Sequence, residues 1–166
     1  MCIRDRDWFE CGLAVIPIVP LLKKTAVTWD PWLADLSDKK ITEYWTQHPA
    51  YEVGFVVSED LIVFDADTPQ AVAALAEIEQ AFDVTPRWVH KTRRGEHHFF
   101  RRAPGTYAKS DAHSIAEHPE RIDVKTGRSI VVLPPSTGKS VEMREVEHAS
   151  DLSLSLIHIR HCRREI

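Results

Sequence analysis

The sequence predicts one α+β domain built on a mixed or antiparallel sheet with flanking helices. Three observations lead to this class. Short runs rich in β-branched and aromatic residues recur along the chain, two segments carry apolar residues at the three-and-four spacing of a helix, and the strands do not alternate regularly with helices. With 166 residues, 43% of them hydrophobic, the chain is long enough for one domain with its own core and too short for two.

The chain opens with an expected strand at 13–19, whose Pro17 places it at an edge or a bulge of the sheet. A polar turn at 23–24 follows. The stretch around Trp29 and Trp32 has no clear periodicity, and we expect it to be irregular.

The next expected elements are a helix and a hairpin. Ser37 should cap the start of a helix that runs through His48. The helix should end there because the next residue, Pro49, cannot continue it. Two short β-rich runs at 53–57 and 61–65 are joined by the three polar residues 58–60, which indicates a compact hairpin.

Thr68 and the proline after it open a second helix, expected to end at Phe82. Strands at 88–91 and 97–101 should flank the turn 92–96.

The last expected elements follow a polar segment, residues 104–119, which we expect to be a long loop. Strands at 121–124 and 130–133 then form an expected hairpin that turns at 126–128.

Composition limits the class of protein without naming a function. The net charge of -4 gives no support for nucleic-acid binding beyond a local basic stripe. The three cysteines lie far apart and form no CxxC pair, which argues against a disulfide framework or a zinc site and favours a reducing compartment. The longest apolar run, residues 13–22, is interrupted by two prolines and is too short to span a membrane. We therefore expect a cytoplasmic protein.

The two ends of the chain differ in character from the rest. Residues 1–6 and 153–166 resemble translated sequencing-adapter read-through, and the alternative for the latter is a short basic amphipathic tail. We expect both ends to be non-native extensions of a domain at 7–150, in a native protein that continued past about Ser150, and we leave them out of the functional argument.

Two carboxylates, Asp65 and Asp67, come at the end of an apolar strand. Alternate side chains of a strand share a face, so both should point the same way. Paired carboxylates repel each other unless a cation lies between them, and Mg²⁺ or Mn²⁺ uses such oxygens together with substrate phosphates. The alternative is a strand that ends in a polar turn, where Asp67 or Thr68 caps the next helix.

A turn with a glycine precedes the second group of candidates. His97 and Phe99 share one face of the following strand, and His98 lies on the other face. The basic residues Lys91 and Arg94 in and before this turn could meet a triphosphate. The alternative is a surface hairpin with solvated histidines and charges.

The third candidate is Asp123, placed between two β-branched residues of a strand. If its face joins that of Asp65 and Asp67, three carboxylates converge, and we expect such convergence to require an ion. A two-metal site spans about 4 Å, so the carboxylates of Asp65 and Asp123 should lie within roughly 10 Å of each other. The alternative is an exposed aspartate on a half-buried strand.

These motifs, in this order, resemble the archaeo-eukaryotic primase superfamily, most closely the bifunctional DNA primase/polymerase (prim-pol) N-terminal domains of phage and plasmid replication proteins. The resemblance rests on D-x-D at 65–67, G-x-H followed by aromatics at 95–100, and Asp123 leading into V-V-x-P-P-S at 131–136. Upstream, residues 12–17 with the lysine pair and Trp29, and 41–45 followed by V-G-F at 53–55, resemble the opening blocks of those domains. The resemblance covers about Trp8 to Ser136, and five weak motifs in one order make a specific signal.

The resemblance implies a primase-polymerase catalytic fold with an RRM-like sheet, and it implies roles for individual residues. Asp65, Asp67 and Asp123 match the family's metal-binding acids, and His97 matches the histidine that contacts the phosphates of the incoming nucleotide. Lys125 and Ser136 lie where the family has nucleotide-proximal residues, a looser match. The turn before His97 is one residue shorter than the common two-glycine form, and we assign the role to His97 rather than His98 because the aromatics then fall in register.

The activity implied is template-directed nucleotidyl transfer from an NTP or dNTP to a 3′-hydroxyl, with two Mg²⁺ or Mn²⁺ ions, in phage or plasmid replication. The implied partners are a single-stranded DNA template, a primer and a helicase domain or partner, with no membrane. Two alternatives stay open: an inactive nucleic-acid-binding replication module, against which the acidic trio argues, and a metal-dependent nuclease, which needs no triphosphate clamp.

Overall fold

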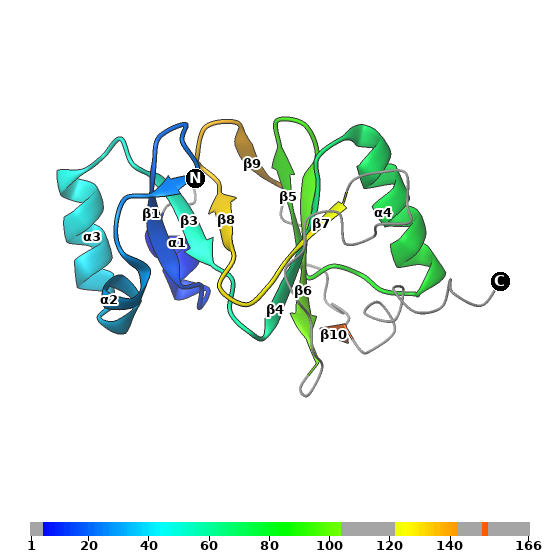
Figure 1. The fold of residues 1–166 in the computed structure, drawn as a ribbon, viewed down its shortest axis with the longest axis horizontal. Helices are drawn as coiled ribbons and strands as arrows, with labels where there is room; N and C mark the ends of the chain where they lie inside the picture. Colours follow the sequence, from blue (N-terminus) through cyan, green and yellow to red (C-terminus); the bar gives the residue numbers. More distant parts are fainter. Residues whose placement is uncertain (1–4, 104–121, 143–150, 153–166) are drawn as a thin grey trace.

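The computed structural model describes residues 5–103, 122–142 and 151–152, and they form an α+β fold with two sheets (Figure 1). The sheets lie side by side, with helices α2 (Trp29–Ala34) and α3 (Asp38–Gln47) at one end of the molecule and α4 (Pro69–Ala81) at the other. A short helix, α1 (Asp5–Glu10), packs against the first sheet and α3.

The first sheet is antiparallel and has the strand order β2-β1-β3-β8. Its strands are β1 (Val15–Val19), β2 (Lys24–Thr25), β3 (Glu52–Val56) and β8 (Ile130–Leu133).

The second sheet has the order β7-β4-β6-β5-β9, and a short strand, β10, pairs with β6 in parallel. Its strands are β4 (Leu61–Ala66), β5 (Trp88–Thr92), β6 (Glu96–Arg102), β7 (Ile122–Lys125), β9 (Lys139–Glu142) and β10 (Asp151–Leu152). The three strands that carry Asp65, His97 and Asp123 are therefore neighbours, as expected.

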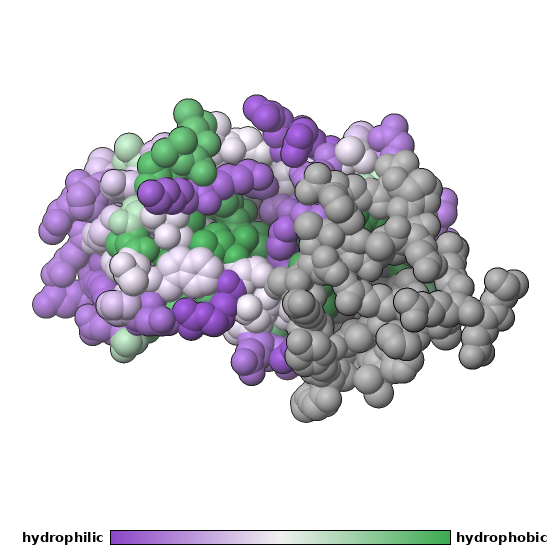
Figure 2. All heavy atoms as spheres, in the orientation of Figure 1, coloured by the Kyte–Doolittle hydropathy of each residue, from purple (hydrophilic) through white to green (hydrophobic). Residues whose placement is uncertain are grey.

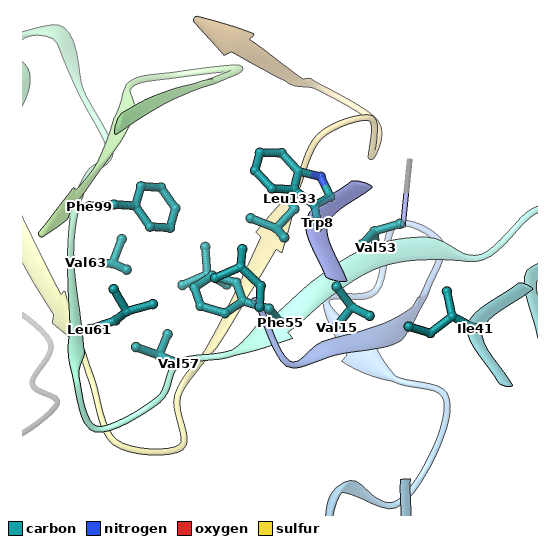
Figure 3. Close-up of a cluster of buried hydrophobic side chains, with 12 residues drawn as sticks. Trp8, Val15, Ile41, Val53, Phe55, Val57, Leu61, Val63, Phe99 and Leu133 are labelled. Carbon is teal, nitrogen blue, oxygen red and sulfur yellow. The ribbon is translucent and has the colours of Figure 1, made fainter. Parts of the chain in front are cut away.

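The largest apolar cluster lies between the two sheets and joins them (Figure 3). Phe55 of β3 and Phe99 of β6 face each other across it, with ring centroids 6.0 Å apart. Trp8 of α1 closes one side, where its indole N–H donates to the carbonyl oxygen of Pro134 at 2.7 Å. Burial of apolar surface from both sheets is the main favourable term that fixes their relative position.

A second apolar cluster lies on the opposite face of the second sheet, under α4. Leu75 and Ala71 of the helix pack there on Phe64 and Phe100 of the sheet. The helix begins where the sequence predicts, because the Thr68 hydroxyl accepts the Ala71 N–H and Pro69 occupies the first turn. Helix α3 likewise begins at its predicted cap, Ser37. The sheet with the candidate site is thus covered on both faces.

Two expected hairpins are wrong, because the strands of each pair belong to different sheets. The runs β3 and β4 do not pair with each other: β3 pairs with β1 and β8, and β4 pairs with β6 and β7. The same holds for β7 and β8, which join different sheets. Strands β3 and β4 are apolar on both faces, so each lies in the interior of a sheet between two neighbours, whereas β7 and β8 are edge strands of two different sheets. The hairpin of β5 and β6 is confirmed.

Other expectations near the N-terminus also need correction. The stretch from Trp29 contains the short helix α2, not only irregular chain, and β1 is an inner strand rather than an edge. Strand β2 pairs only with Ile18 and Val19, so on that side Pro17 lies at the end of the ladder. The expected loop at 104–119 lies outside the described residues.

The expected limits of the domain, 7–150, stay a prediction. Helix α1 begins at Asp5, two residues before the expected start of the domain, and β10 begins at Asp151, one residue after its expected end. Within the described ranges there is no helix of the length and apolar character that crossing a membrane requires.

Candidate functional site

The candidate site is built on the middle of the second sheet. Asp65, near the end of β4, lies directly opposite His97 of β6 on one side and Asp123 of β7 on the other. Directly opposed residues on antiparallel strands present their side chains to the same face. Asp67 follows β4 by one residue and reaches the same face, as the alternation of a strand predicts.

These four side chains line one cavity of about 340 Å³. Its remaining walls are three lysines and one strand of the first sheet. The lining residues are Lys23, Asp65, Asp67, His97, Asp123, Lys125, Ile130, Val131, Val132 and Lys139. The cavity therefore lies where the two sheets meet, and both contribute to it.

Asp65 and His97 form the most buried polar contact of the cavity. The His97 Nε2 lies 3.3 Å from the Asp65 Oδ1, and the histidine side chain is only 6% exposed. Burial alone would raise the pKa of Asp65, but the hydrogen bond from His97 and the charges of Lys125 and Lys139 outweigh it, so the pKa is lowered. Burial lowers the pKa of His97, and Asp65 offsets this only in part. At neutral pH the pair is a carboxylate that accepts a hydrogen bond from a neutral imidazole.

Lys125 links the two opposed carboxylates. Its ammonium lies 2.9 Å from the Asp123 Oδ2 and 4.0 Å from the Asp65 Oδ2. Those two oxygens cannot be farther apart than the sum of these distances, which is within the roughly 10 Å expected of acids that share a metal site. One lysine thus holds two like charges together on adjacent strands.

Asp67 has a cationic partner of its own, Arg94 from the turn between β5 and β6, at 3.1 Å. Gly95 brings this turn onto the end of β4: a Cβ at Gly95 would lie 1.8 Å from the carbonyl oxygen of Ala66. Only glycine allows that approach, so the glycine of the G-x-H motif is required by contact with the residue between the two acids.

Each of the three carboxylates also has a positive or hydrogen-bonding partner within the chain: His97 for Asp65, Arg94 for Asp67 and Lys125 for Asp123. Among the described residues, no three His, Cys, Asp or Glu side chains form a ready-made metal cluster. The expectation that the convergence of the acids requires an ion stays a prediction.

His98 lies on the opposite face of β6, as the strand alternation predicts. Its Nδ1 is 2.6 Å from a Glu79 carboxylate oxygen of α4, and its Nε2 is 3.0 Å from one of Glu96. Burial alone would lower the pKa of His98, but the hydrogen bonds and charges of these two glutamates outweigh it and raise the pKa. His98 thus ties α4 to the sheet, and His97 is the histidine that faces the cavity.

A third histidine, His90, lies behind the cavity, opposite His97 on β5. It is fully buried and packs on Phe99 and Trp8, with ring centroids 4.4 Å and 5.0 Å away. Burial, with the nearby His97 and Lys139, lowers its pKa to about 3. Neither of its nitrogens has a hydrogen-bond partner among the described residues. His90 is therefore a neutral side chain at neutral pH, buried next to His97.

Three of the residues expected near the nucleotide lie outside the lining. Ser136 is buried, and its hydroxyl bridges the backbone N–H and carbonyl of Val53, both at 3.0 Å, which fixes the end of β8 to β3. Lys91 lies on β5, and Arg94 reaches the site only through Asp67. Lys125 does line the cavity, as expected.

Lys139 and Lys23 also line the cavity. Lys23 belongs to the lysine pair that resembles the family's opening block but had no expected role in the site, and Lys139 carries no sequence signal. Lys139 comes from β9, and its Nζ lies 3.4 Å from the His97 Nε2. Burial lowers the pKa of Lys139, and the charges of Lys23 and Arg94 add to this while Asp65 and Asp67 oppose it. Lys139 follows a Thr-Gly turn beyond the last expected strand, and only the pairing of β9 with β5 brings it to the acids.

The chain was compared with known proteins. The sequence model of the family described as bifunctional DNA primase/polymerase, N-terminal, matches residues 6–154. Comparison with curated proteins gave no match.

Proposed function

The chain belongs to the bifunctional DNA primase/polymerase N-terminal domain family, and from this premise we propose that its cavity transfers nucleotides from an NTP or dNTP to a 3′-hydroxyl on a DNA template. The family supports a primase/polymerase-type nucleotidyltransferase that acts on DNA and nucleotides. The ions, the triphosphate contacts and the roles of single residues are our proposal.

One observation carries the proposal. Asp65 is opposed by His97 and by Asp123 at once, and all three face a cavity that also holds Lys23, Lys125 and Lys139. Acids that can hold a divalent ion thus lie beside cations that can hold a polyphosphate. Phosphoryl transfer needs both, because its catalysis is mostly positioning and charge neutralisation.

The donor set fits Mg²⁺ or Mn²⁺. Asp65, Asp67 and Asp123 supply hard oxygen ligands, and the largest contribution to binding Mg²⁺ often comes from one or two carboxylates together with substrate phosphates rather than from a cage of protein ligands alone. A preformed cluster of three protein ligands is therefore not required. Two divalent ions held there would lower the pKa of the attacking hydroxyl and neutralise charge on the leaving pyrophosphate.

The chain's own cations do the rest of the work in this proposal. Lys125 and Lys139 are each half-buried beside the acids. When metal ions take over the neutralisation of the carboxylates, these ammonium groups are free to pair with phosphate oxygens. Before that, they keep the acidic cavity from destabilising the fold.

His97 is proposed to contact the phosphates of the incoming nucleotide. It is a neutral imidazole whose orientation is fixed by Asp65 and by packing near Phe99, 6.4 Å away between ring centroids. A fixed donor costs little reorganisation when the substrate arrives, which is the condition for effective electrostatic stabilisation.

The test is incubation of the protein with a primed single-stranded template, labelled nucleotides and Mn²⁺. Primer extension supports the proposal, provided that Asp65→Asn abolishes it and Asp35→Asn, an exposed aspartate far from the cavity, does not. Degradation of the template would instead identify a nuclease, and retention without extension would identify a binding module.

We also infer the setting from the resemblance to phage and plasmid replication proteins. The protein would act in the cytoplasm of a prokaryotic host, with a helicase domain or partner that opens the template. Extension from a fork substrate, with and without an added replicative helicase, tests this.

A further inference from the structure

A second hollow in the molecule is not used by the proposed catalysis. It is an open groove of about 620 Å³ at the edge of the first sheet, lined by the segment 24–30 and by Arg128. Trp29 and Arg128 are its most distinctive side chains. The Arg128 guanidinium lies over the Trp29 ring, 5.7 Å from its centroid.

The groove and the catalytic cavity border the same two segments of chain. Lys23 lines the cavity and Lys24 the groove, and Ile130 lines the cavity and Arg128 the groove. The two hollows are therefore lined by residues that are adjacent or two positions apart in the chain, Lys23 and Lys24 in one segment and Arg128 and Ile130 in the other.

Both side chains are held in place. The indole N–H of Trp29 donates to the Thr25 hydroxyl at 3.3 Å, and part of the ring packs on the apolar cluster behind it. Arg128 pairs with Asp30 at 2.7 Å, and its backbone N–H donates to the Val57 carbonyl. Arg128 has φ of 68°, in the left-handed region, so the turn after β7 directs it to this position at some conformational cost.

The chemistry of the groove suits a nucleobase. A half-buried indole next to an exposed guanidinium is a stacking platform, because every base has a π-face and arginine adds cation–π attraction and pairing with phosphate. Directly before Lys23 and Lys24 the chain carries two exposed leucines, Leu21 and Leu22, 77% and 67% exposed. Figure 2 shows hydrophobic side chains projecting above this β1–β2 connection. Such an apolar tip fits contact with unpaired bases rather than with water.

We propose that this groove binds the single-stranded template next to the catalytic cavity, with one base stacked on Trp29 and the strand's phosphate paired with Arg128 and Lys24. The inference rests on the proposed function, because that function identifies the bound strand as a DNA template. The groove is open rather than enclosed, and its cations Lys24 and Arg128 lie within two residues of cavity-lining residues in the chain, which suits a strand that passes through better than a free nucleotide.

The experiment measures the binding of a fluorescein-labelled single strand of oligothymidine by fluorescence anisotropy, without divalent ions. Trp29→Leu should weaken binding about tenfold, and Trp29→Phe, which keeps an aromatic face, much less. Arg128→Asn removes the charge with a residue that tolerates the left-handed conformation, and it should flatten the salt dependence of log K by about 0.7. Arg87→Ala is the matched control, because Arg87 covers Trp88 at 5.2 Å on the other sheet. It should bind like the wild type.

Two further readouts separate this inference from the proposed function. Binding of a free fluorescent dNTP should be the same in Trp29→Leu and wild type. If Trp29→Leu loses the dNTP and keeps the oligonucleotide, the groove serves the incoming nucleotide and the inference is overturned. Cooperative thermal unfolding shows which variants are folded. The inference is also overturned if folded Arg128→Asn and Trp29→Phe bind like the wild type and Trp29→Leu binds weakly only because it is unfolded. Trp29-dependent binding by a protein that extends no primer would support the groove and reject the proposed catalysis.

Discussion

Asp65 on β4 and Asp123 on β7 lie directly opposite each other, and the Lys125 ammonium is within 4.0 Å of a carboxylate oxygen of each. Like charges directly opposed on neighbouring strands are destabilising. The lysine lets the fold hold the two acids together before any ion binds. This relationship determines whether substitution of the two acids or of Lys125 should raise or lower activity, stability and metal binding.

Asp65→Asn and Asp123→Asn should each lower nucleotidyl transfer by about 10²–10³-fold, the usual scale when a charge-stabilising group is lost from a transition state. Primer extension under single-turnover conditions measures this, with Asp35→Asn as the control. Activity in both variants within a few-fold of wild type would exclude these acids as metal ligands.

The pH dependence of Asp65 has a definite sign. Its pKa is lowered in the fold, so its contribution to stability is present above the ordinary value of 3.8 and is lost as the pH falls through the lowered value. Asp65→Asn should therefore lose stability at neutral pH relative to wild type, and the difference should shrink in acid. Urea unfolding at pH 7 and pH 3 tests this, and a variant more stable than wild type at pH 7 contradicts it.

Lys125→Gln should tighten Mn²⁺ binding in the absence of nucleotide, on the order of tenfold, because it removes a positive charge that competes with the ion for Asp65 and Asp123. The same variant should extend primers more slowly, since it loses a proposed phosphate contact. Mn²⁺ titration by electron paramagnetic resonance measures the first effect. Lys39→Gln, on the exposed face of α3, is the matched control.

His97→Ala and His98→Ala should fail in different ways. His97 faces the cavity, so its loss should raise the KM for the nucleotide and lower kcat with little change in Mn²⁺ binding. His98→Ala leaves Glu79 and Glu96 without their shared partner and should cost about 3 kcal/mol of stability, with activity per folded molecule retained. Steady-state kinetics and urea unfolding of both variants separate the two; the reverse pattern would place the functional histidine at His98.

His98 also predicts how stability depends on pH. Its pKa is raised in the fold, so its contribution is fully present below the ordinary value of 6.5 and is lost as the pH rises through the raised value. Wild type should lose stability across that window relative to His98→Gln, which cannot titrate. Unfolding free energies of both proteins, measured in steps from pH 6 upward, give the comparison, and parallel curves would count against a protonated His98.

Gly95→Ala should destabilise the fold by roughly 1–3 kcal/mol, because the new Cβ would meet the Ala66 carbonyl oxygen and push the turn away from the acids. Activity should fall more than stability explains, since Arg94, which pairs with Asp67, moves with that turn. Gly127→Ala is a useful comparison: no atom lies within 4 Å of its Cβ position, so only the backbone strain of φ 46° opposes it.

The local elements could be predicted because their causes are local. The caps Ser37 and Thr68 set the starts of two helices through side-chain acceptance of backbone N–H groups a few residues away. The strand alternation that puts Asp65 and His97 toward the cavity, and His98 away from it, follows from the two-residue period of a strand alone. Partner choice is different: nothing within the run 61–65 says that it pairs with β6 and β7 rather than with its neighbour in sequence.

By itself the sequence determined the α+β class, the family, the face of each acid and which histidine shares that face. These follow from periodicity and from motif order, which depend on the geometry of residues close together in the chain. The tertiary structure alone decided that two sheets share the core, that Lys23 and Lys139 reach the acids, and that Ser136 ties β8 to β3 instead of lining the cavity. It also showed that each of the three acids has a partner side chain in the same chain: His97, Arg94 or Lys125. Such facts arise from contacts between residues far apart in the chain, where packing of apolar faces sets which strands meet, and charge compensation follows from which side chains that packing brings together.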